Sequence, residues 1–357
     1  MNSSKLMEPI RVGALTLKNR VVMAPLTRCR AIENRVPNDW MVEYYRQRSG
    51  AGMILSEATA VDPMGVGYPS TPGIWSDEQV EGWKKITDAV HEAGGVIVCQ
   101  LWHVGRISHP TVLNGATPVA PSAIRPDGHV SQLRPITPYE IPRALDLEEI
   151  SGIVAQYKRG AKNAMKAGFD GVEVHGANGY LIDQFLHEKS NTRTDQYGGS
   201  IENRVRFLME VCDVCIDVWG KDRVGVHLAP RGDSHDVGSS DLAELFGYVA
   251  GELKRKGIAF LCARESYDET ALGPELKRIF GGVYIANEGF TKASAEAAIE
   301  FGDADAVAFG KSYIANPDLA ERFAQDAPLN EPDPSTFYHG LPNGYTDYPT
   351  LSEVRNT

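Results

Sequence analysis

The chain has 357 residues, of which 42% are hydrophobic and 23% are charged, and its formal net charge at pH 7 is −11. These proportions are ordinary for a globular protein and exclude a disordered, collagen-like or coiled-coil chain. No Lys/Arg run exceeds 254–256 and no apolar run approaches the roughly 20 residues of a membrane span, so we expect no nucleic-acid partner and no membrane anchor. Because Met1 to Lys18 contain no hydrophobic signal core, we expect a cytoplasmic location.

Eight short runs that are nearly continuously apolar or β-branched are spread along the chain, and each is typical of a strand that is buried on both faces. In chain order they are 20–24, 52–55, 96–100, 171–174, 224–228, 258–262, 283–286 and 306–309. Stretches with a helical period separate them, and the clearest are 77–93, 146–167, 200–218, 241–256 and 292–301. This alternation predicts an α/β fold whose parallel sheet closes as a (β/α)8 TIM barrel.

The longest interruption of this pattern is the stretch 101–143, which is rich in Pro, Gly, Ser and Thr. A loop of this length is usually functional and often contains a small hairpin. It follows the third predicted strand, so it should lie over the carboxyl-terminal mouth of the barrel, where active sites of this fold occur. No linker interrupts the chain, and we predict one domain, 1–357, with 101–143 as a lid insertion.

The five cysteines are sparse and odd in number, which argues against a disulfide framework and for a reducing compartment. Cys212 and Cys215 form a C-x-x-C pair. They are either a redox pair or half of a metal site, or simply neighbours at helical spacing in the amphipathic stretch 205–218, which we favour. The sequence lacks a second such pair and shows no other metal-ligand spacing, so no metal is predicted.

Polar and mostly uncharged residues, such as Thr27 and Gln100, follow the predicted strands at the barrel mouth. The sharpest cluster is His175-x-x-Asn178-x-Tyr180, which comes directly after the fourth strand. His175 and Asn178 can donate hydrogen bonds to one ligand oxygen, and Tyr180 can give a proton. Each residue taken singly is more often structural, but their common position at the mouth favours a function.

The last two strand–helix units offer a phosphate site. Loops after strands seven and eight bind phosphate in many barrels through backbone N–H groups. Gly289 and Gly310 would allow close approach of the backbone, and Lys311 would add a positive charge. These glycines could equally be turn residues only. Neither a Rossmann nor a P-loop glycine motif occurs, so those nucleotide folds are not indicated.

Several long motifs of the chain resemble those of the Old Yellow Enzyme family. They are Met23-Ala24-Pro25-Leu26-Thr27-Arg28, Gln100-Leu101-Trp102-His103, His175-Gly176-Ala177-Asn178-Gly179-Tyr180-Leu181, the stretch 191–200, and Ala315-Asn316-Pro317-Asp318-Leu319. The resemblance spans nearly the whole chain. Within the family, the sequence looks most similar to bacterial xenobiotic reductases, N-ethylmaleimide reductases and glycerol trinitrate reductases.

The resemblance implies an ene reductase with one non-covalently bound FMN. NADPH or NADH would deliver hydride to flavin N5 by ping-pong chemistry, and an electron-poor alkene would then take the hydride at its β-carbon. The implied substrates are enones and maleimides, together with nitro esters and nitroaromatics. We therefore expect small molecules as partners, and a monomer or a homodimer.

The resemblance also implies roles for individual residues. His175 and Asn178 would bind the activating oxygen of the substrate, and Tyr180 would protonate its α-carbon. The implied cofactor contacts are Pro25, Leu26, Thr27, Ala58, Gln100, His175, Asn178, His227, Arg231, Gly289, Gly310 and Lys311. The implied substrate pocket consists of Tyr68, Trp102, His235 and Tyr345.

Three positions depart from the family pattern. His227 stands where an arginine is common, so either His227 or Arg231 would offset the negative charge of the reduced flavin. Lys311 stands at the phosphate position where an arginine is common. Its ammonium is a point charge, whereas a guanidinium has a planar fork of donors. The oxygen-binding pair is His175 and Asn178, where several bacterial relatives have two histidines.

Two other functions stay open on the sequence alone. A flavin-free aldolase or hydrolase would need a Schiff-base lysine at a strand end, for which Lys311 is the only candidate. A non-catalytic flavin store would not require His175, Asn178 and Tyr180. A multidomain dienoyl-CoA reductase is excluded, because it would need an iron–sulfur cysteine cluster and a second nucleotide domain.

Overall fold

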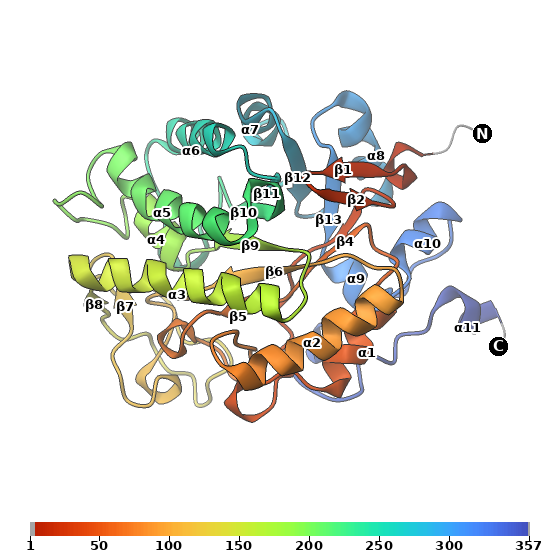
Figure 1. Ribbon diagram of the computed structural model, residues 1–357, viewed down its shortest axis with the longest axis horizontal. Helices are drawn as coiled ribbons and strands as arrows, with labels where there is room; N and C mark the ends of the chain where they lie inside the picture. The colour runs from red at the N-terminus through yellow and green to blue at the C-terminus, as the bar shows by residue number, and fades with distance from the viewer. Residues whose placement is uncertain (1–3, 356–357) are drawn as a thin grey trace.

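Eight strands pair side by side in parallel and form a closed barrel (Figure 1). The computed structural model describes residues 4–355, so the two ends of the predicted 1–357 domain lie outside the described residues. The barrel strands are β3 (Val21–Met23), β4 (Met53–Leu55), β6 (Ile97–Trp102), β9 (Gly171–Gly176), β10 (Val224–Leu228), β11 (Phe260–Arg264), β12 (Val283–Asn287) and β13 (Ala306–Phe309). The ring closes because β13 pairs with β3 and β4 pairs with β6. The predicted (β/α)8 barrel is therefore confirmed.

Strand residues alternate between the barrel interior and the surrounding helices, because successive side chains of a strand point to opposite faces. The interior side chains form one apolar cluster that includes Val22, Ala24, Met53, Leu55, Val98, Phe260, Cys262, Ile285, Ala306 and Ala308. Their neighbours in sequence, such as Val21 and Val307, belong instead to the large cluster shared with the helices. The barrel is thus filled with side chains, and a ligand site can form only at its ends.

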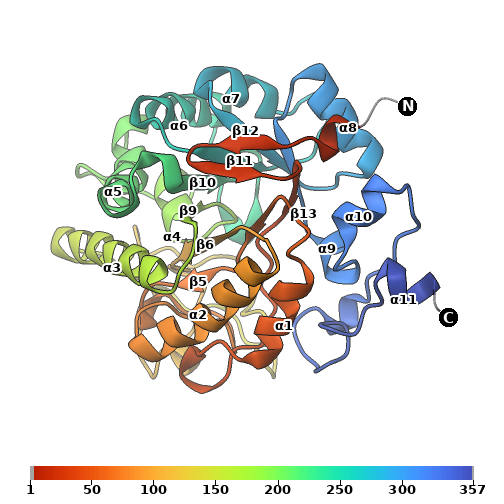
Figure 2. The ribbon, with the colours of Figure 1, turned by 45° about the vertical axis from the view of Figure 1, so that its right-hand side comes forward.

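A hairpin that the sequence did not indicate closes the amino-terminal end of the barrel. It consists of β1 (Ile10–Val12) and β2 (Leu15–Leu17), which pair antiparallel. Gly13 makes the turn with a φ of 55°, and a Cβ there would lie 2.2 Å from the carbonyl oxygen of Asp222. The apolar residues of the hairpin join the interior cluster, and Figure 2 shows it in front of β11 and β12. The open end of the barrel is therefore the carboxyl-terminal one.

Helices surround the barrel on its outside (Figure 1). The longer ones are α1 (Asp39–Gln47), α2 (Asp77–Glu92), α3 (Leu147–Lys166), α5 (Ile201–Trp219), α6 (Leu242–Lys256), α7 (Gly273–Phe280) and α8 (Lys292–Phe301). The shorter ones are α4 (Leu181–Leu186), α9 (Lys311–Ala315), α10 (Leu319–Ala324) and α11 (Leu351–Arg355). All five predicted helices are present. Ser76 starts α2 with a capping box, and Gly257 ends α6 in the left-handed conformation.

The long segment between β6 and α3 contains little regular structure. Two short strands, β7 (Val119–Ala120) and β8 (Arg143–Ala144), pair in parallel, so they do not form the expected hairpin. One antiparallel bridge between His129 and Pro138 is the nearest equivalent. A further short strand, β5 (Thr59–Ala60), pairs with the end of β6.

This segment covers the carboxyl-terminal mouth of the barrel. Val130 and Tyr139 are buried in a cluster with Tyr68 and Trp102, which come from the loop after β5 and the end of β6. The contact is apolar and excludes water from one side of the mouth.

The segment after α10 returns to the barrel mouth and is held by two arginines that follow β3. Arg28 donates a hydrogen bond to the carbonyl oxygen of Phe337 at 2.9 Å, and Arg30 donates to the same oxygen at 2.7 Å. Tyr345 stacks on Tyr44 with the ring centroids 4.3 Å apart. Because a guanidinium offers five donors, these arginines satisfy carbonyl groups of a segment that has almost no secondary structure of its own.

Cys212 and Cys215 lie on the buried face of α5, and all five thiols are buried and free. Burial raises the pKa of Cys212 to about 12, so its thiol is unreactive at neutral pH. This supports their interpretation as neighbours on a helix. None of the helices in the described part of the chain is long and apolar enough to cross a membrane.

Candidate active site

A cavity of about 670 Å³ opens at the carboxyl-terminal end of the barrel. Its size falls within the usual range of cofactor and ligand sites. The predicted site residues on its wall are Pro25, Leu26, Thr27, Ala58, Tyr68, Gln100, His175, Asn178, Tyr180, His227, His235, Gly289, Gly310 and Lys311. The barrel topology therefore brings together residues that are far apart in the sequence.

His175 lies near the end of β9, on the strand face that points into the barrel. Its Nδ1 accepts a hydrogen bond of 3.3 Å from the backbone N–H of Ala177, and an N–H group can only donate. The proton of the neutral ring is therefore on Nε2, which makes Nε2 a donor. Burial, followed by the nearby His227, lowers the pKa of His175 well below its usual value, so the ring stays neutral.

Asn178 and Gly179 form a left-handed turn after β9, with φ values of 59° and 74°. Asparagine tolerates this conformation better than most residues, and Gly179 is required because a Cβ there would lie 2.2 Å from the carbonyl oxygen of Ser234. The turn brings the Asn178 side chain to the cavity wall, where its Oδ1 accepts a hydrogen bond of 2.8 Å from Nη1 of Arg264. The amide N–H₂ end is left for another partner.

Tyr180 lies on the same wall, just before α4. Its ring is edge-on to the rings of Trp102 and His175, with centroid distances of 5.0 and 5.2 Å. Its hydroxyl oxygen is 2.9 Å from that of Tyr68. Burial raises the pKa of Tyr180, so the hydroxyl keeps its proton at neutral pH. A protonated phenol in a cavity can serve as a general acid.

His235 reaches this cluster from the loop after β10. Its Nδ1 lies 2.7 Å from the carbonyl oxygen of Asn178, so Nδ1 carries the proton and donates it. Its Nε2 is then an acceptor, 3.5 Å from the Tyr68 hydroxyl. Burial lowers the pKa of His235, which keeps the ring neutral. His235 therefore lies on the cavity wall, between Asn178 and Tyr68.

A polar layer of interior side chains lies at the floor of the cavity. Gln100 donates a hydrogen bond of 2.8 Å to Oε2 of Glu173, and Nδ1 of His227 lies 3.3 Å from Oε1 of the same carboxylate. Glu173, His227 and Cys262 bring one potential ligand atom each within 4.8 Å of one another, which could accept a metal ion. Sequence spacing does not reveal this group, because its members come from three neighbouring strands. Burial raises the pKa of the Cys262 thiol, which opposes its use as a thiolate ligand.

The opposite end of the cavity has the features of a phosphate site. Gly289 follows β12 with a φ of 72°, and Gly310 directly precedes α9, which begins at Lys311. Backbone N–H groups in the first turn of a helix have no partner within the helix. These N–H groups and the Lys311 ammonium give this end of the cavity a positive character that suits an anion.

Arg231 is not on the cavity wall, although it was predicted to contact the cofactor. Its Nε donates to Glu265 at 2.8 Å and its Nη1 to Asp268 at 3.2 Å. These carboxylates turn the guanidinium toward the loop after β11. Of the two residues considered for a positive group near the flavin, His227 is the one that lines the cavity.

Trp102 and Tyr345 are also absent from the cavity wall. Trp102 is fully buried behind Tyr68, and the two stacked rings are 5.7 Å apart. Tyr345 is fully buried on Tyr44, within the cluster that holds the C-terminal segment. Both residues therefore support wall residues or neighbouring segments from behind.

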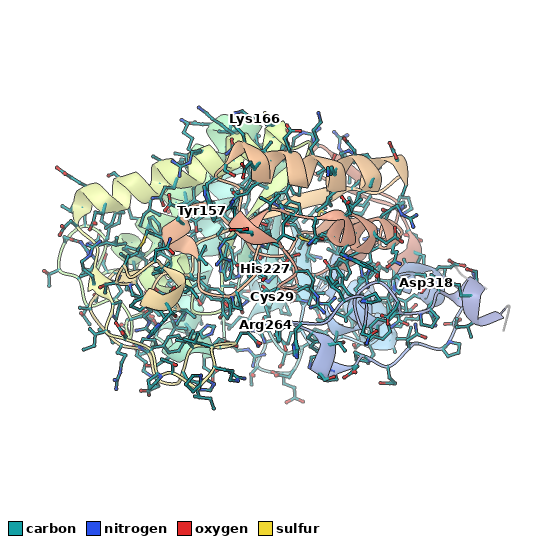
Figure 3. The ribbon with its side chains drawn as sticks, turned by 90° about the horizontal axis from the view of Figure 1, so that it is seen from below. Cys29, Tyr157, Lys166, His227, Arg264 and Asp318 are labelled. Atoms are coloured by element: carbon teal, nitrogen blue, oxygen red, sulfur yellow. The ribbon has the colours of Figure 1, made fainter. Side chains whose placement is uncertain are left out.

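The cavity wall also contains residues that the sequence analysis missed. Arg264 is the last residue of β11, two positions after the predicted strand end, and Figure 3 shows it with His227 near the middle of the molecule. The alternation of strand residues could have revealed it, because Cys262 and Arg264 share the interior face. Phe337 and Tyr338 reach the wall from the C-terminal segment, which no sequence pattern connects to the barrel.

The fold and the site define a barrel enzyme whose mouth combines neutral hydrogen-bond donors, a protonated phenol and a basic end that suits an anion. A family model described as the NADH:flavin oxidoreductase / NADH oxidase family matches residues 5–330. The chain belongs to this family.

Similar proteins cover almost the whole chain. A probable flavin mononucleotide-dependent alkene reductase of Leishmania infantum is 45% identical over an alignment of 355 residues that covers 97% of each protein. 12-Oxophytodienoate reductase 2 of Arabidopsis thaliana is 44% identical over an alignment of 372 residues that covers 99% of this chain and 97% of the relative.

Solved structures agree with these relatives. The old yellow enzyme homologue of Zymomonas mobilis matches with a TM-score of 0.94 at 46% identity, over 97% of this chain and 99% of the other. Morphinone reductase in complex with tetrahydroNAD matches with a TM-score of 0.93 at 48% identity, over 97% of both chains. The predicted Old Yellow Enzyme family, the flavin cofactor and the NAD(P)H-dependent oxidoreductase class are thereby confirmed.

Proposed function

We propose that this protein is an FMN-dependent ene reductase that uses NADPH or NADH to reduce electron-poor alkenes such as enones and maleimides, and that it also reduces nitro esters and nitroaromatics. The observation that carries the proposal is the convergence of three groups on one cavity wall. These are Nε2 of His175, the amide of Asn178 and the hydroxyl of Tyr180. The alkene reductase among the relatives supports the same reaction class.

The residues of the cavity fit FMN. Gly289, Gly310 and Lys311 would hold the phosphate, and Thr27, Ala58 and Gln100 would contact the flavin ring, as would the backbone at Pro25 and Leu26. Nδ1 of His227 faces Glu173, whereas its Nε2 is buried without a hydrogen-bond partner, which is expected of a residue that meets a polar ligand. When bound, FMN supplies the electron carrier that accepts hydride from the reduced nicotinamide and passes it to the substrate.

His175 and Asn178 would bind the carbonyl or nitro oxygen of the substrate. Negative charge grows on this oxygen as hydride adds to the alkene. Two neutral donors that are held in place beforehand stabilise this charge without reorganisation, and removal of one such donor typically costs about 100-fold or more in rate. The pair is already oriented, because the backbone N–H of Ala177 fixes the tautomer of His175 and Arg264 donates a hydrogen bond to Oδ1 of Asn178.

Tyr180 would complete the reaction by protonating the α-carbon of the alkene. Its hydroxyl keeps its proton because burial raises its pKa. Tyr68 lies within hydrogen-bonding distance of that hydroxyl and orients it. Nitro ester reduction does not require protonation of a carbon, so it should depend little on Tyr180.

We assign to His227, and not to Arg231, the position next to the negative edge of the reduced flavin. His227 lies on the cavity floor beside Glu173, whereas Arg231 is paired with Glu265 and Asp268. A Schiff-base lysine is disfavoured, because Lys311 begins a helix at the phosphate end of the cavity.

We further propose that the chain acts as one barrel domain with 101–143 as its lid. Ser131 and Gln132 of this segment line the cavity. A lid that excludes water strengthens the electrostatic contacts in the site. Tyr68, Trp102 and Tyr139 connect the lid to the site.

Titration with phenol tests this assignment. A phenolate held by His175 and Asn178 against the flavin should give a long-wavelength charge-transfer band. In Asn178→Ala, the dissociation constant should rise by about tenfold or more, because one hydrogen bond to a charged oxygen is lost. The flavin spectrum of the free variant serves as the control for folding. An unchanged dissociation constant would contradict the assignment.

A further inference from the structure

We propose that Arg264 is a positioning residue that fixes the amide of Asn178 so that its N–H₂ end, and not its oxygen, faces the substrate. The inference rests on the proposed function, because it explains how the oxygen-binding pair becomes a pair of donors. No role for Arg264 follows from the motifs of the sequence.

The position of Arg264 follows from the strand that carries it. Phe260 and Cys262 of β11 point into the barrel, so Arg264 has the same orientation at the mouth. It is level with Asn287 of the neighbouring β12. A long side chain at this point reaches over the mouth to the turn after β9, where Asn178 lies.

The contact between Arg264 and Asn178 can form in only one orientation of the Asn178 amide. Nη1 of Arg264 lies 2.8 Å from Oδ1 of Asn178. A guanidinium carries donors and no acceptor, so it can meet only the oxygen of the amide. The orientation of the amide therefore follows from the chemistry of its partner, although oxygen and nitrogen are nearly identical in shape.

An asparagine needs such a partner in this role. Rotation of the amide by half a turn would replace the donor by an oxygen, which repels the negative charge that grows on the substrate oxygen. The backbone N–H of Ala177 prevents the equivalent error at His175 by holding Nδ1 as an acceptor. Arg264 performs the same task for Asn178, so both donors are set before the substrate binds.

The ion pair of Arg264 explains why orientation, and not net charge, is its task. Its Nε donates a hydrogen bond to the carboxylate of Glu288, which also lines the cavity. Glu288 has a φ of 102°, an unusual value for a residue with a side chain, and directly precedes Gly289 of the phosphate end. The carboxylate offsets the positive charge of Arg264, so the guanidinium attracts an anionic ligand weakly while it still holds the amide.

A double-mutant cycle on the FMN-loaded protein tests the proposal. Arg264→Met, Asn178→Ala and the double variant are titrated with anionic phenol and with neutral nicotinamide, and binding is followed by the flavin absorbance. Arg264→Met should weaken both ligands by about tenfold. The double variant should bind no more weakly than Asn178→Ala alone, because Arg264 acts through Asn178. Arg264→Lys, which keeps a donor and the charge, should recover part of the affinity.

Arg231→Met is the matched control, because it removes a guanidinium that follows the neighbouring β10 and does not touch the cavity. It should leave both dissociation constants unchanged. If Arg264→Met loses FMN, Arg264→Gln replaces it in the cycle. The glutamine amide keeps an N–H₂ donor without the charge, so both ligands should be weakened by less than about tenfold. This loss should again disappear in the Asn178→Ala background.

Any of three results would overturn the inference. The first is additive losses in the double variant. The second is a loss that affects phenol alone, persists in the Asn178→Ala background and vanishes at high salt, since this would show that Arg264 attracts the ligand by its charge. If Asn178→Ala weakens binding and Arg264→Met does not, this inference fails and the proposed function stands. If Asn178→Ala has no effect, the proposed oxygen site itself fails.

Discussion

The hydroxyl oxygens of Tyr68 and Tyr180 lie 2.9 Å apart in the wall of the cavity. Tyr68 is buried and Tyr180 is half-buried, and burial raises both pKa values, so the two hydroxyls share one hydrogen bond and keep their protons. Tyr68 thereby fixes the direction of the group that we assign as the proton donor. The pair connects the lid side of the mouth, where Tyr68 packs, with the turn after β9.

Tyr180→Phe should slow alkene reduction by about 100-fold or more, because a positioned general acid contributes about that much. Flavin reduction by NADPH or NADH should hardly change, since it needs no proton from Tyr180. Stopped-flow absorbance separates the two half-reactions. Tyr68→Phe should give a smaller loss, about tenfold, in the same half-reaction. Equal slowing of both half-reactions by Tyr180→Phe would remove its role as proton donor.

His227→Leu should lower the reduction potential of the bound flavin, because the reduced, negatively charged form loses a polar partner on the cavity floor. Arg231→Leu should leave the potential unchanged, because Arg231 is bound to Glu265 and Asp268. A redox titration with a reference dye measures both. A shift in Arg231→Leu together with none in His227→Leu would reverse the assignment.

Lys311→Ala should weaken FMN binding by about tenfold to 100-fold, because one charged contact to the phosphate is lost. The affinity of the variant should also depend less on salt than that of the natural protein. Lys311→Arg should bind FMN more tightly, since a guanidinium can contact two phosphate oxygens at once. Fluorescence of released FMN during dilution gives the dissociation constants. Equal affinities in all three proteins would place the phosphate elsewhere.

The buried carboxyl group of Glu57 should lower the free energy of unfolding as the pH rises. Burial raises its pKa from 4.5 to about 7, although the backbone N–H of Arg28 and other donors oppose this. Between these two pH values the unfolded carboxyl loses its proton while the folded one retains it, so the free energy of unfolding falls as the pH increases, by up to about 3 kcal/mol in total.

The variant Glu57→Gln isolates this contribution, because the amide resembles the protonated acid and does not titrate. Urea unfolding of both proteins at pH 5 and pH 8 gives the comparison. The natural protein should lose stability relative to the variant at pH 8. A constant difference between the two proteins at both pH values would mean that the pKa of Glu57 is not raised in the folded state.

The barrel was predictable because its buried strands are nearly continuous apolar runs, as in 306–309, and because the candidate site residues lie at the ends of such strands or just after them. His175, Asn178 and Tyr180 come together for the latter reason, since His175 lies near the end of β9 and the other two lie in the turn that follows it. Arg264 was missed because it is polar, so the apolar run ends before it although the strand continues.

Arg231 and Tyr345 could not be placed from the sequence, because non-local partners decide where they point. Arg231 forms an ion pair with Glu265, which follows β11. Tyr345 is held by its stacking on Tyr44 and by the arginines that bind the C-terminal segment. Such contacts join segments far apart in the chain and have no periodic pattern. The hairpin at the amino-terminal end of the barrel escaped prediction for a related reason, since its strands are only three residues long.

The most direct test of the account is an anaerobic redox cycle of the purified protein, followed by its flavin absorbance. We predict that the protein binds FMN, that NADPH or NADH bleaches the visible absorbance of the oxidised flavin, and that 2-cyclohexenone restores this absorbance with formation of cyclohexanone. A protein that binds no FMN, or whose reduced flavin is not reoxidised by the enone, would contradict the proposed function.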